Sequence, residues 1–153
     1  MQIDRIDRQM LRYLQQDGRI SNQELADRVG LSPSPCLRRL RALEEAGIIA
    51  GYHTRLDAKQ LGYTLMALIH ISMDAHTPER FKHFDQEIAA MPEVLECLLI
   101  TGQEADYQLK VIVPDMDAFQ ELLLNRITRI PGVTGVHSSF VLRRVVDRTD
   151  VPV

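Results

Sequence analysis

The residues best suited to chemistry are the hydroxyl and guanidinium groups of one short stretch, residues 32–47. Such groups donate hydrogen bonds to phosphate oxygens and to base edges, so a cluster of them suits the binding of nucleic acid. Pro35 disfavours a helical Ser34 and itself fits a first helical position, which predicts a helix over residues 35–46 with Ser34 as N-cap. The predicted nucleic-acid contacts are Ser32, Ser34, Pro35, Arg38, Arg39 and Arg41.

The segment before this helix decides between two interpretations, because an ordinary amphipathic helix can also carry a solvated basic face. Residues 21–30 begin with a capping box, Ser21 and Glu24, and end at Gly30. Two short capped helices joined by a tight turn make a helix-turn-helix, whose second helix enters the major groove N-terminus first. The context therefore favours double-stranded DNA as the partner.

A third helix is predicted ahead of these two, from Asp4 as N-cap to Gln16. The extended stretch after the three helices, residues 48–56, is predicted as a wing, a linker strand or both. The three helices would share one apolar core, made of Ile6, Met10, Leu14, Leu25, Val29, Leu31, Leu37, Leu40 and Leu43.

The second half of the chain changes to a pattern of strands and helices. The predicted elements are a strand at 64–74, a helix at 78–90, strands at 95–101 and 107–113, a helix at 116–130 and a strand at 136–146. This βαββαβ order predicts a ferredoxin-like domain with both helices on one face of an antiparallel sheet. Because both alternating sets of residues 64–74 are largely apolar, the other face is predicted to pair with a second copy in an isologous dimer.

The loop at residues 101–107 contains groups that could hold a free amino acid. Asp106 offers a carboxylate for an ammonium, Thr101 offers a hydroxyl, and the backbone around Gly102 offers unhindered N–H groups. The same residue types also suit an ordinary hairpin loop, with Gly and Asp serving turn geometry. The residues alone leave both interpretations open.

Two runs in the first half, residues 31–40 and 43–52, resemble the DNA-binding domain of the Lrp/AsnC family of transcriptional regulators, and the resemblance extends along nearly the whole chain. It implies an α+β protein in which an N-terminal (winged) helix-turn-helix domain precedes a ferredoxin-like ligand-binding and dimerisation domain. It also implies a homodimer that assembles to an octamer. The sequence departs from the family's Gly-x-x-Asp-Tyr loop by one extra residue between Gly102 and Asp106. The effector-binding residues that the resemblance implies are Thr101, Gly102, Glu104, Asp106, Ser138 and Ser139.

Domain boundaries and charge agree with this organisation. We predict a DNA-binding domain at 1–50, a linker at 51–63 and an effector-binding and oligomerisation domain at 64–153. Residues 1–56 carry nine Arg and Lys against seven Asp and Glu, whereas the remainder carries nine against fourteen. A first domain that is basic relative to the second suits local attraction to phosphate.

Several function classes are not supported by the sequence. The two cysteines, Cys36 and Cys97, lack ligand-spaced partners, so neither a metal site nor a disulfide is expected, and we predict no cofactor. No signal peptide or membrane span is predicted, which favours a cytoplasmic protein. Sirohaem decarboxylases have a similar two-domain architecture, and this resemblance would imply histidines near the second strand of the C-terminal domain. The corresponding run, residues 94–100, has no histidine, so we predict that the chain is not an enzyme. The alternative kept open is an architectural DNA-binding protein that responds to no effector.

Overall fold

The computed structural model describes residues 2–102 and 104–153 and divides the chain into two compact units. The first unit extends to Arg55 and also includes the C-terminal segment Asp147–Val153, and the second is Leu56–Val146. The sequence had assigned that C-terminal segment to the second domain. No helix of the described residues is long and apolar enough to span a membrane.

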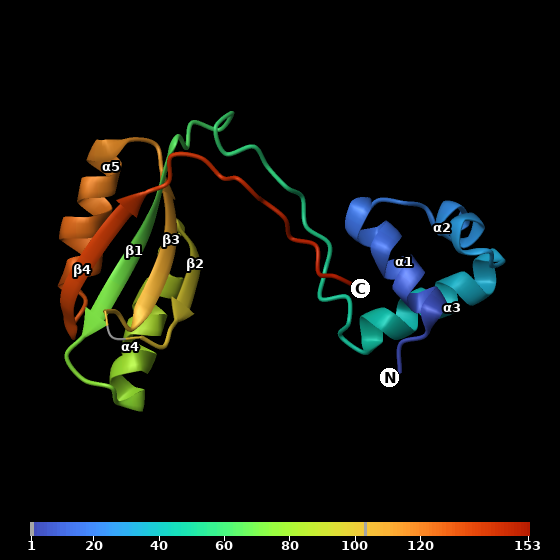
Figure 1. Cartoon of the computed structure of the whole chain (residues 1–153), viewed down its shortest axis with the longest axis horizontal. Helices are drawn as coiled ribbons and strands as arrows, with labels where there is room; N and C mark the ends of the chain where they lie inside the picture. Colours follow the sequence, from blue (N-terminus) through green and yellow to red (C-terminus); the bar gives the residue numbers. More distant parts are fainter. Residues whose placement is uncertain (1, 103) are drawn as a thin grey trace. The chain divides into compact units, whose positions relative to one another are not determined.

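The first unit contains three helices, α1 (Arg5–Gln16), α2 (Asn22–Val29) and α3 (Pro33–Glu45) (Figure 1). Asp4 is the N-cap of α1, as predicted, and forms a reciprocal capping box with Asp7. At α2, Ser21 accepts a hydrogen bond from the Glu24 N–H, but the Glu24 carboxylate pairs with Arg28 instead of closing the predicted box.

The start of α3 differs from the prediction that Ser34 would be the N-cap. Ser32 has the extended N-cap backbone, and Pro33 occupies the first helical position. Both Pro33 and Pro35 lie in the first turn, where a helix has no acceptors for its N–H groups, so neither proline removes a hydrogen bond. A helix that starts at Pro33 therefore accommodates both prolines and gains two residues.

The core of the first unit agrees with the predicted residues except along α3. Met10, Leu25 and Leu43 are fully buried, and the other predicted residues are half-buried, but Leu37 is not among those that pack against the core cluster. Cys36 takes the inward position and is fully buried, so its small side chain packs in the core. Burial also raises the pKa of the Cys36 thiol.

Two extended segments belong to the first unit as well. The first runs from residue 46 to Arg55 and continues into the second unit, and residues 46–64 contain no strand, so the predicted linker strand is absent from this described stretch. Tyr52 in this stretch donates a hydrogen bond of 3.0 Å to the Glu44 carboxylate of α3. The C-terminal segment contacts α1, where Gln15 donates to the Val151 carbonyl at 3.0 Å and accepts from the Val151 N–H at 2.7 Å.

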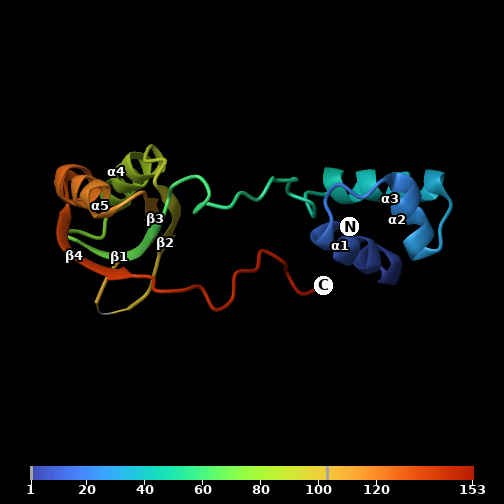
Figure 2. The same cartoon turned by 90° about the horizontal axis from the view of Figure 1, so that it is seen from above.

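The second unit has the predicted ferredoxin-like order. Its antiparallel sheet has the strand order β2-β3-β1-β4, and α4 and α5 lie on the same face of it (Figure 2). The elements are β1 (Leu65–Met73), α4 (Pro78–Ala89), β2 (Val94–Leu99), β3 (Tyr107–Val113), α5 (Met116–Glu121) and β4 (Val133–Phe140).

Two elements of this unit depart from their predicted extents by more than two residues. The predicted helix 116–130 is α-helical only to Glu121 and continues as a π turn, Leu122–Arg126, and a 3₁₀ turn, Ile127–Arg129. The wider π turn lets Leu122 and Ile127, five residues apart, both point into the core. The last strand ends at Phe140 instead of residue 146, since the chain beyond leaves the sheet and Leu142 is 98% exposed.

The sheet has one covered and one open face within the chain. Ala67, Ile69 and Ile71 of β1 are buried under the helices, whereas the alternate residues, including Leu68 and His70, are only half-buried on the opposite face. The strand register places Lys110 of β3 and Ser139 of β4 beside Leu68 on this open face.

Candidate nucleic-acid interface and effector loop

The exposed side of α3 carries a narrow polar stripe, which we define as Ser34, Arg38 and Arg41. These residues are spaced four and three apart, so they fall on one side of the helix, and all three are exposed. Among the described residues, Arg38 and Arg41 have no side-chain partner. Both guanidiniums are therefore available to phosphate oxygens or base edges.

The N-terminus of α3 adds a second set of donors next to the stripe. The Ser32 hydroxyl makes no capping hydrogen bond, and the first turn has unpaired backbone N–H groups that favour an anion. Asn22 of α2 donates a hydrogen bond of 2.9 Å to the Pro33 carbonyl, which fixes the turn between the two helices. Pro35 is half-buried in the first turn of the helix, and its ring lacks an N–H donor.

Arg39, which the sequence predicted as a DNA contact, is directed toward α1. Its Nη1 donates hydrogen bonds of 2.8 Å to Asp4 Oδ2 and 2.8 Å to Asp7 Oδ1. Asp7 is 2% exposed, so one of these carboxylates lies within the fold. No local pattern indicates this pairing, because the partners lie 35 and 32 residues away.

The charges of this cluster support one another. Asp7 and Asp4 raise the pKa of the Arg39 guanidinium through their hydrogen bonds. The Asp7 backbone N–H and then Arg39 hold the pKa of the Asp4 carboxyl below its ordinary value, against the effect of desolvation. Asp4 and Arg39 are therefore charged at neutral pH.

The loop predicted to bind an effector is organised by Asp106. Its carbonyl accepts a hydrogen bond of 2.8 Å from the Ile100 N–H, which closes the loop. Its carboxylate accepts 2.7 Å from the Met73 N–H, and His76 Nε2 lies 2.7 Å from the other carboxylate oxygen. Sequence reasoning missed His76, because it lies on a different connection and meets Asp106 only through the fold.

The remaining predicted effector residues do not converge within one chain. Thr101, Gly102 and Glu104 are exposed in the loop. The register of β4 places Ser138 on the helix-covered face, where its hydroxyl is buried and has no partner among the described residues, and Ser139 on the open face. The two adjacent serines therefore cannot line one surface of the same sheet.

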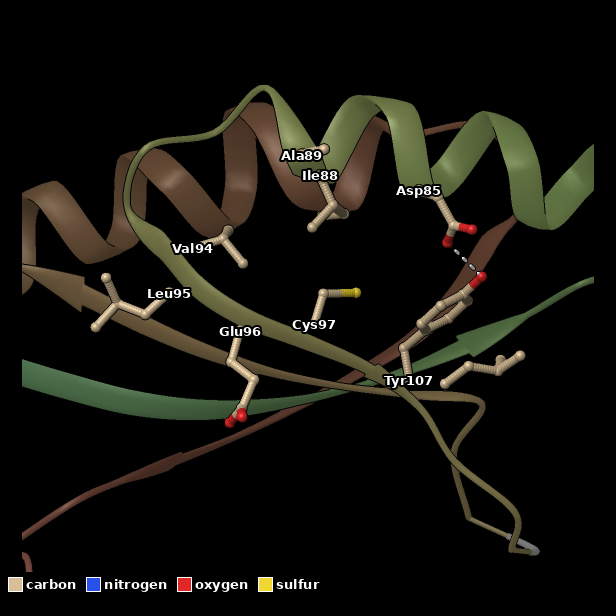
Figure 3. Close-up of a pocket in the computed structure, with 9 residues that line it drawn as sticks. Asp85, Ile88, Ala89, Val94, Leu95, Glu96, Cys97 and Tyr107 are labelled. Atoms are coloured by element: carbon tan, nitrogen blue, oxygen red, sulfur yellow. Dashed lines mark hydrogen bonds between the residues drawn. The ribbon is translucent and has the colours of Figure 1, made fainter. Parts of the chain in front are cut away.

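A groove of about 390 Å³ lies between α4 and the edge strand β2 (Figure 3). Tyr107 at its end donates a hydrogen bond of 2.8 Å to Asp85, and Cys97 points into it from β2. Burial and then the Asp85 charge raise the pKa of the Cys97 thiol to about 11, so this thiol is protonated at neutral pH. None of the predicted effector residues lines this groove. The described residues include no group of three or more potential metal-ligating side chains.

An exposed cationic helix in a three-helix unit, followed by a ferredoxin-like domain, defines a two-domain regulator that binds DNA. Two family descriptions match the same parts of the chain: a winged helix-turn-helix DNA-binding domain over residues 3–50, and the Lrp/AsnC ligand binding domain over residues 66–151. The chain belongs to the Lrp/AsnC family of transcriptional regulators.

Individual relatives match along nearly their whole length. The Bkd operon transcriptional regulator of Pseudomonas aeruginosa is 42% identical over 99% of this chain and 98% of its own. The leucine-responsive regulatory protein of Escherichia coli is 43% identical over 94% of this chain and 87% of its own. A transcriptional regulator of Neisseria meningitidis, solved in complex with L-methionine, superposes with a TM-score of 0.94 at 38% identity and covers 99% of this chain and 97% of its own.

Proposed function

We propose that this regulator reads double-stranded DNA with the stripe Ser34, Arg38 and Arg41, and that the Ser32 hydroxyl and the first turn of α3 bind an adjacent phosphate. The exposure of the stripe is the observation that carries the proposal, because Arg38 and Arg41 are unpaired among the described residues. Phosphate contacts fix the position of such a helix, and base contacts provide selectivity.

The test of this assignment is Arg38→Ala, measured against a duplex that the wild-type protein selects from a random-sequence library. We expect a loss of about 1–3 kcal/mol with relaxed preference at one base pair if Arg38 reads a guanine, and a shallower salt dependence if it contacts phosphate. Arg8→Ala is the matched control, since Arg8 is an exposed arginine of α1. Unchanged binding by Arg38→Ala would remove this residue from the interface.

We further infer that the effector is a free amino acid and that it binds around residues 101–106. The complex of the Neisseria meningitidis relative with L-methionine supports this ligand class. Ser138 and Ser139 lie on opposite faces of the sheet, so one chain does not bring all the predicted residues to one surface, and we propose that another subunit supplies further groups to the exposed loop. The residues proposed to take part remain Thr101, Gly102, Glu104, Asp106, Ser138 and Ser139.

A thermal-shift screen against the twenty amino acids tests the effector proposal. A ligand present at 100 times its dissociation constant stabilises the native state by about 2.7 kcal/mol. L-methionine is the first candidate, and a selective shift by one amino acid would identify the metabolite to add to the DNA titration. A panel without any shift would favour the alternative of a DNA-binding protein that responds to no amino acid.

The open face of the sheet is the proposed dimer interface. Half-buried Met66 and Leu68 supply apolar surface there, beside Ile112, which is buried. An isologous pair would present two α3 helices to two half-sites. We propose further assembly to an octamer, a cytoplasmic location and no catalytic activity. Sedimentation analysis with and without the amino acid measures the assembly directly.

A further inference from the structure

We propose that Arg39 is a positioning residue: it ties α3 to the first turn of α1 and thereby orients the stripe Ser34, Arg38 and Arg41 toward DNA. This assignment replaces the contact with DNA that the sequence predicted for Arg39. It rests on the DNA-binding function proposed above and assigns a different task to each of two adjacent arginines.

The position of Arg39 on the helix separates it from the stripe. Successive residues of an α-helix are rotated by about 100°, so Arg39 is directed well away from Arg38. The exposed fraction of its side chain is 32%, and its Nη1 bonds both Asp4 and Asp7. Moving Arg39 to DNA would leave the buried Asp7 carboxylate without its cation, which is costly.

Each of the four carboxylate oxygens of Asp4 and Asp7 accepts a hydrogen bond in this arrangement. Asp4 accepts the Asp7 N–H on Oδ1 at 2.9 Å and Arg39 on Oδ2 at 2.8 Å. Asp7 accepts the Asp4 N–H on Oδ2 at 3.1 Å and Arg39 on Oδ1 at 2.8 Å. Each carboxylate therefore has one oxygen for the capping box and one for Arg39, and the same two residues fix both the start of α1 and the side of α3.

The cluster of Arg39, Asp4 and Asp7 restricts the rotation of α3 about its own axis, which apolar packing restricts only weakly. Cys36 and Leu43 hold α3 against the core, but apolar contacts are not directional and allow some rotation about the helix axis. The stripe is narrow, so a small rotation of α3 would turn Arg38 or Arg41 away from the major groove of the DNA. Two charge-assisted hydrogen bonds to a rigid cap specify the rotation.

Two substitutions separate positioning from reading. Both hydrogen bonds of Arg39 come from the single nitrogen Nη1, so the one ammonium group of Arg39→Lys can bond both carboxylates. An ammonium cannot reproduce the two parallel N–H groups with which an arginine guanidinium binds guanine. Arg39→Gln removes the charge and leaves Asp7 unpaired. The probe is the duplex selected by the wild-type protein, titrated at several salt concentrations.

We expect Arg39→Lys to bind within about threefold of the wild type, with unchanged preference among duplexes that carry single base changes. We expect Arg39→Gln to bind about tenfold more weakly, with an unchanged slope of log affinity against log salt concentration. Loss of preference at one base pair in Arg39→Lys, or a slope shallower by about 0.9 in Arg39→Gln, would overturn the proposal. Wild-type affinity in Arg39→Gln would overturn it as well.

A stability measurement keeps this test independent of the DNA-binding proposal. A double-mutant cycle of Arg39→Gln and Asp7→Asn, followed by thermal unfolding, should show strong coupling, and Arg38→Gln with Asp7→Asn should show none. If the wild-type protein selects no duplex, the DNA-binding function fails while the coupling remains. If the duplex binds but Arg39 and Asp7 are not coupled, the positioning role fails alone.

Discussion

Arg38 and Arg41 of α3 extend from the fold without partners among the described residues, whereas both oxygens of Asp106 in the effector loop are engaged by Met73 and His76. The helix therefore presents its binding groups to a partner without rearrangement. A ligand of the loop that used the Asp106 carboxylate would have to share it with the Met73 N–H and His76 or displace one of them. The difference suits a regulator in which DNA binding is the basal activity and the effector changes it, because a ligand must distinguish two states to do so.

The largest test of this comparison separates the two units. Leu25 is 1% exposed in the core of the first unit, and Leu25→Ala should cost about 2–5 kcal/mol of that unit's stability through lost contacts and a cavity. We expect DNA binding to be lost while any amino-acid-induced thermal shift of the second unit remains. Calorimetry and the thermal-shift assay measure both.

The matched control for this experiment is Leu142→Ala, because Leu142 is 98% exposed. That variant should retain the stability and the DNA binding of the wild type. Simultaneous unfolding of both units by Leu25→Ala would show that they are thermodynamically coupled, which contradicts a separate DNA-reading unit.

Asp106→Ala tests the loop side of the comparison. The substitution removes the acceptor of the Met73 N–H. Because Met73 is only 7% exposed, we expect the unpaired N–H to lower the stability of the second unit by about 1–3 kcal/mol. We also expect the amino-acid response to disappear while basal DNA binding stays at the wild-type level. DNA titrations with and without the effector provide the measurement.

Asp117→Ala is the control for Asp106, since it removes an exposed carboxylate from the first turn of α5. A full amino-acid response in Asp106→Ala would exclude Asp106 from the effector site. The loop would then be an ordinary connection whose aspartate serves only the fold.

The difference between the two regions also explains what the sequence could predict. Asp4, Ser21 and Gly30 were correctly assigned to the ends of helices, because capping depends on residues three or four positions apart. The order of strands and helices in the second unit followed from alternation and helical periodicity in the same local way. The start of α3 was misplaced because Pro33 and Pro35 both fit a first turn, and the helix begins at the earlier of the two prolines.

Long-range partners could not be predicted from local patterns. Arg39 meets Asp4 and Asp7 through the packing of α3 on α1, and His76 meets Asp106 across two connections of the second unit. The opposite orientation of Ser138 and Ser139 follows from the period of a strand, but which of them faces the helices depends on the register. The sequence therefore identifies residues that are able to bind a ligand, but only the fold shows which partner each of them has.

The smallest expected effect concerns the connection that leaves α3. The pKa of Tyr52 is raised to about 12 by burial and by its hydrogen bond to the Glu44 carboxylate. A raised pKa in the folded state means that the contribution to stability is complete below pH 10, the ordinary value for tyrosine, and is lost as the pH rises toward 12. Ultraviolet titration should show Tyr52 ionising above the ordinary range, and Tyr52→Phe should remove that signal.

Tyr52→Phe should lower the stability of the first unit by only about 0.5 kcal/mol, the low end for a hydrogen bond, because the tyrosine is 48% exposed. Tyr63→Phe is the control, since Tyr63 is 41% exposed and lies in the second unit. If DNA affinity is unchanged in Tyr52→Phe, the orientation of α3 depends on its contacts with α1 and the core and not on the connection. A loss of DNA affinity as large as that expected for Arg39→Gln would instead show that the segment after α3 also positions the helix. The binding groups of α3 would then depend on a contact outside the helix, as Asp106 of the loop does.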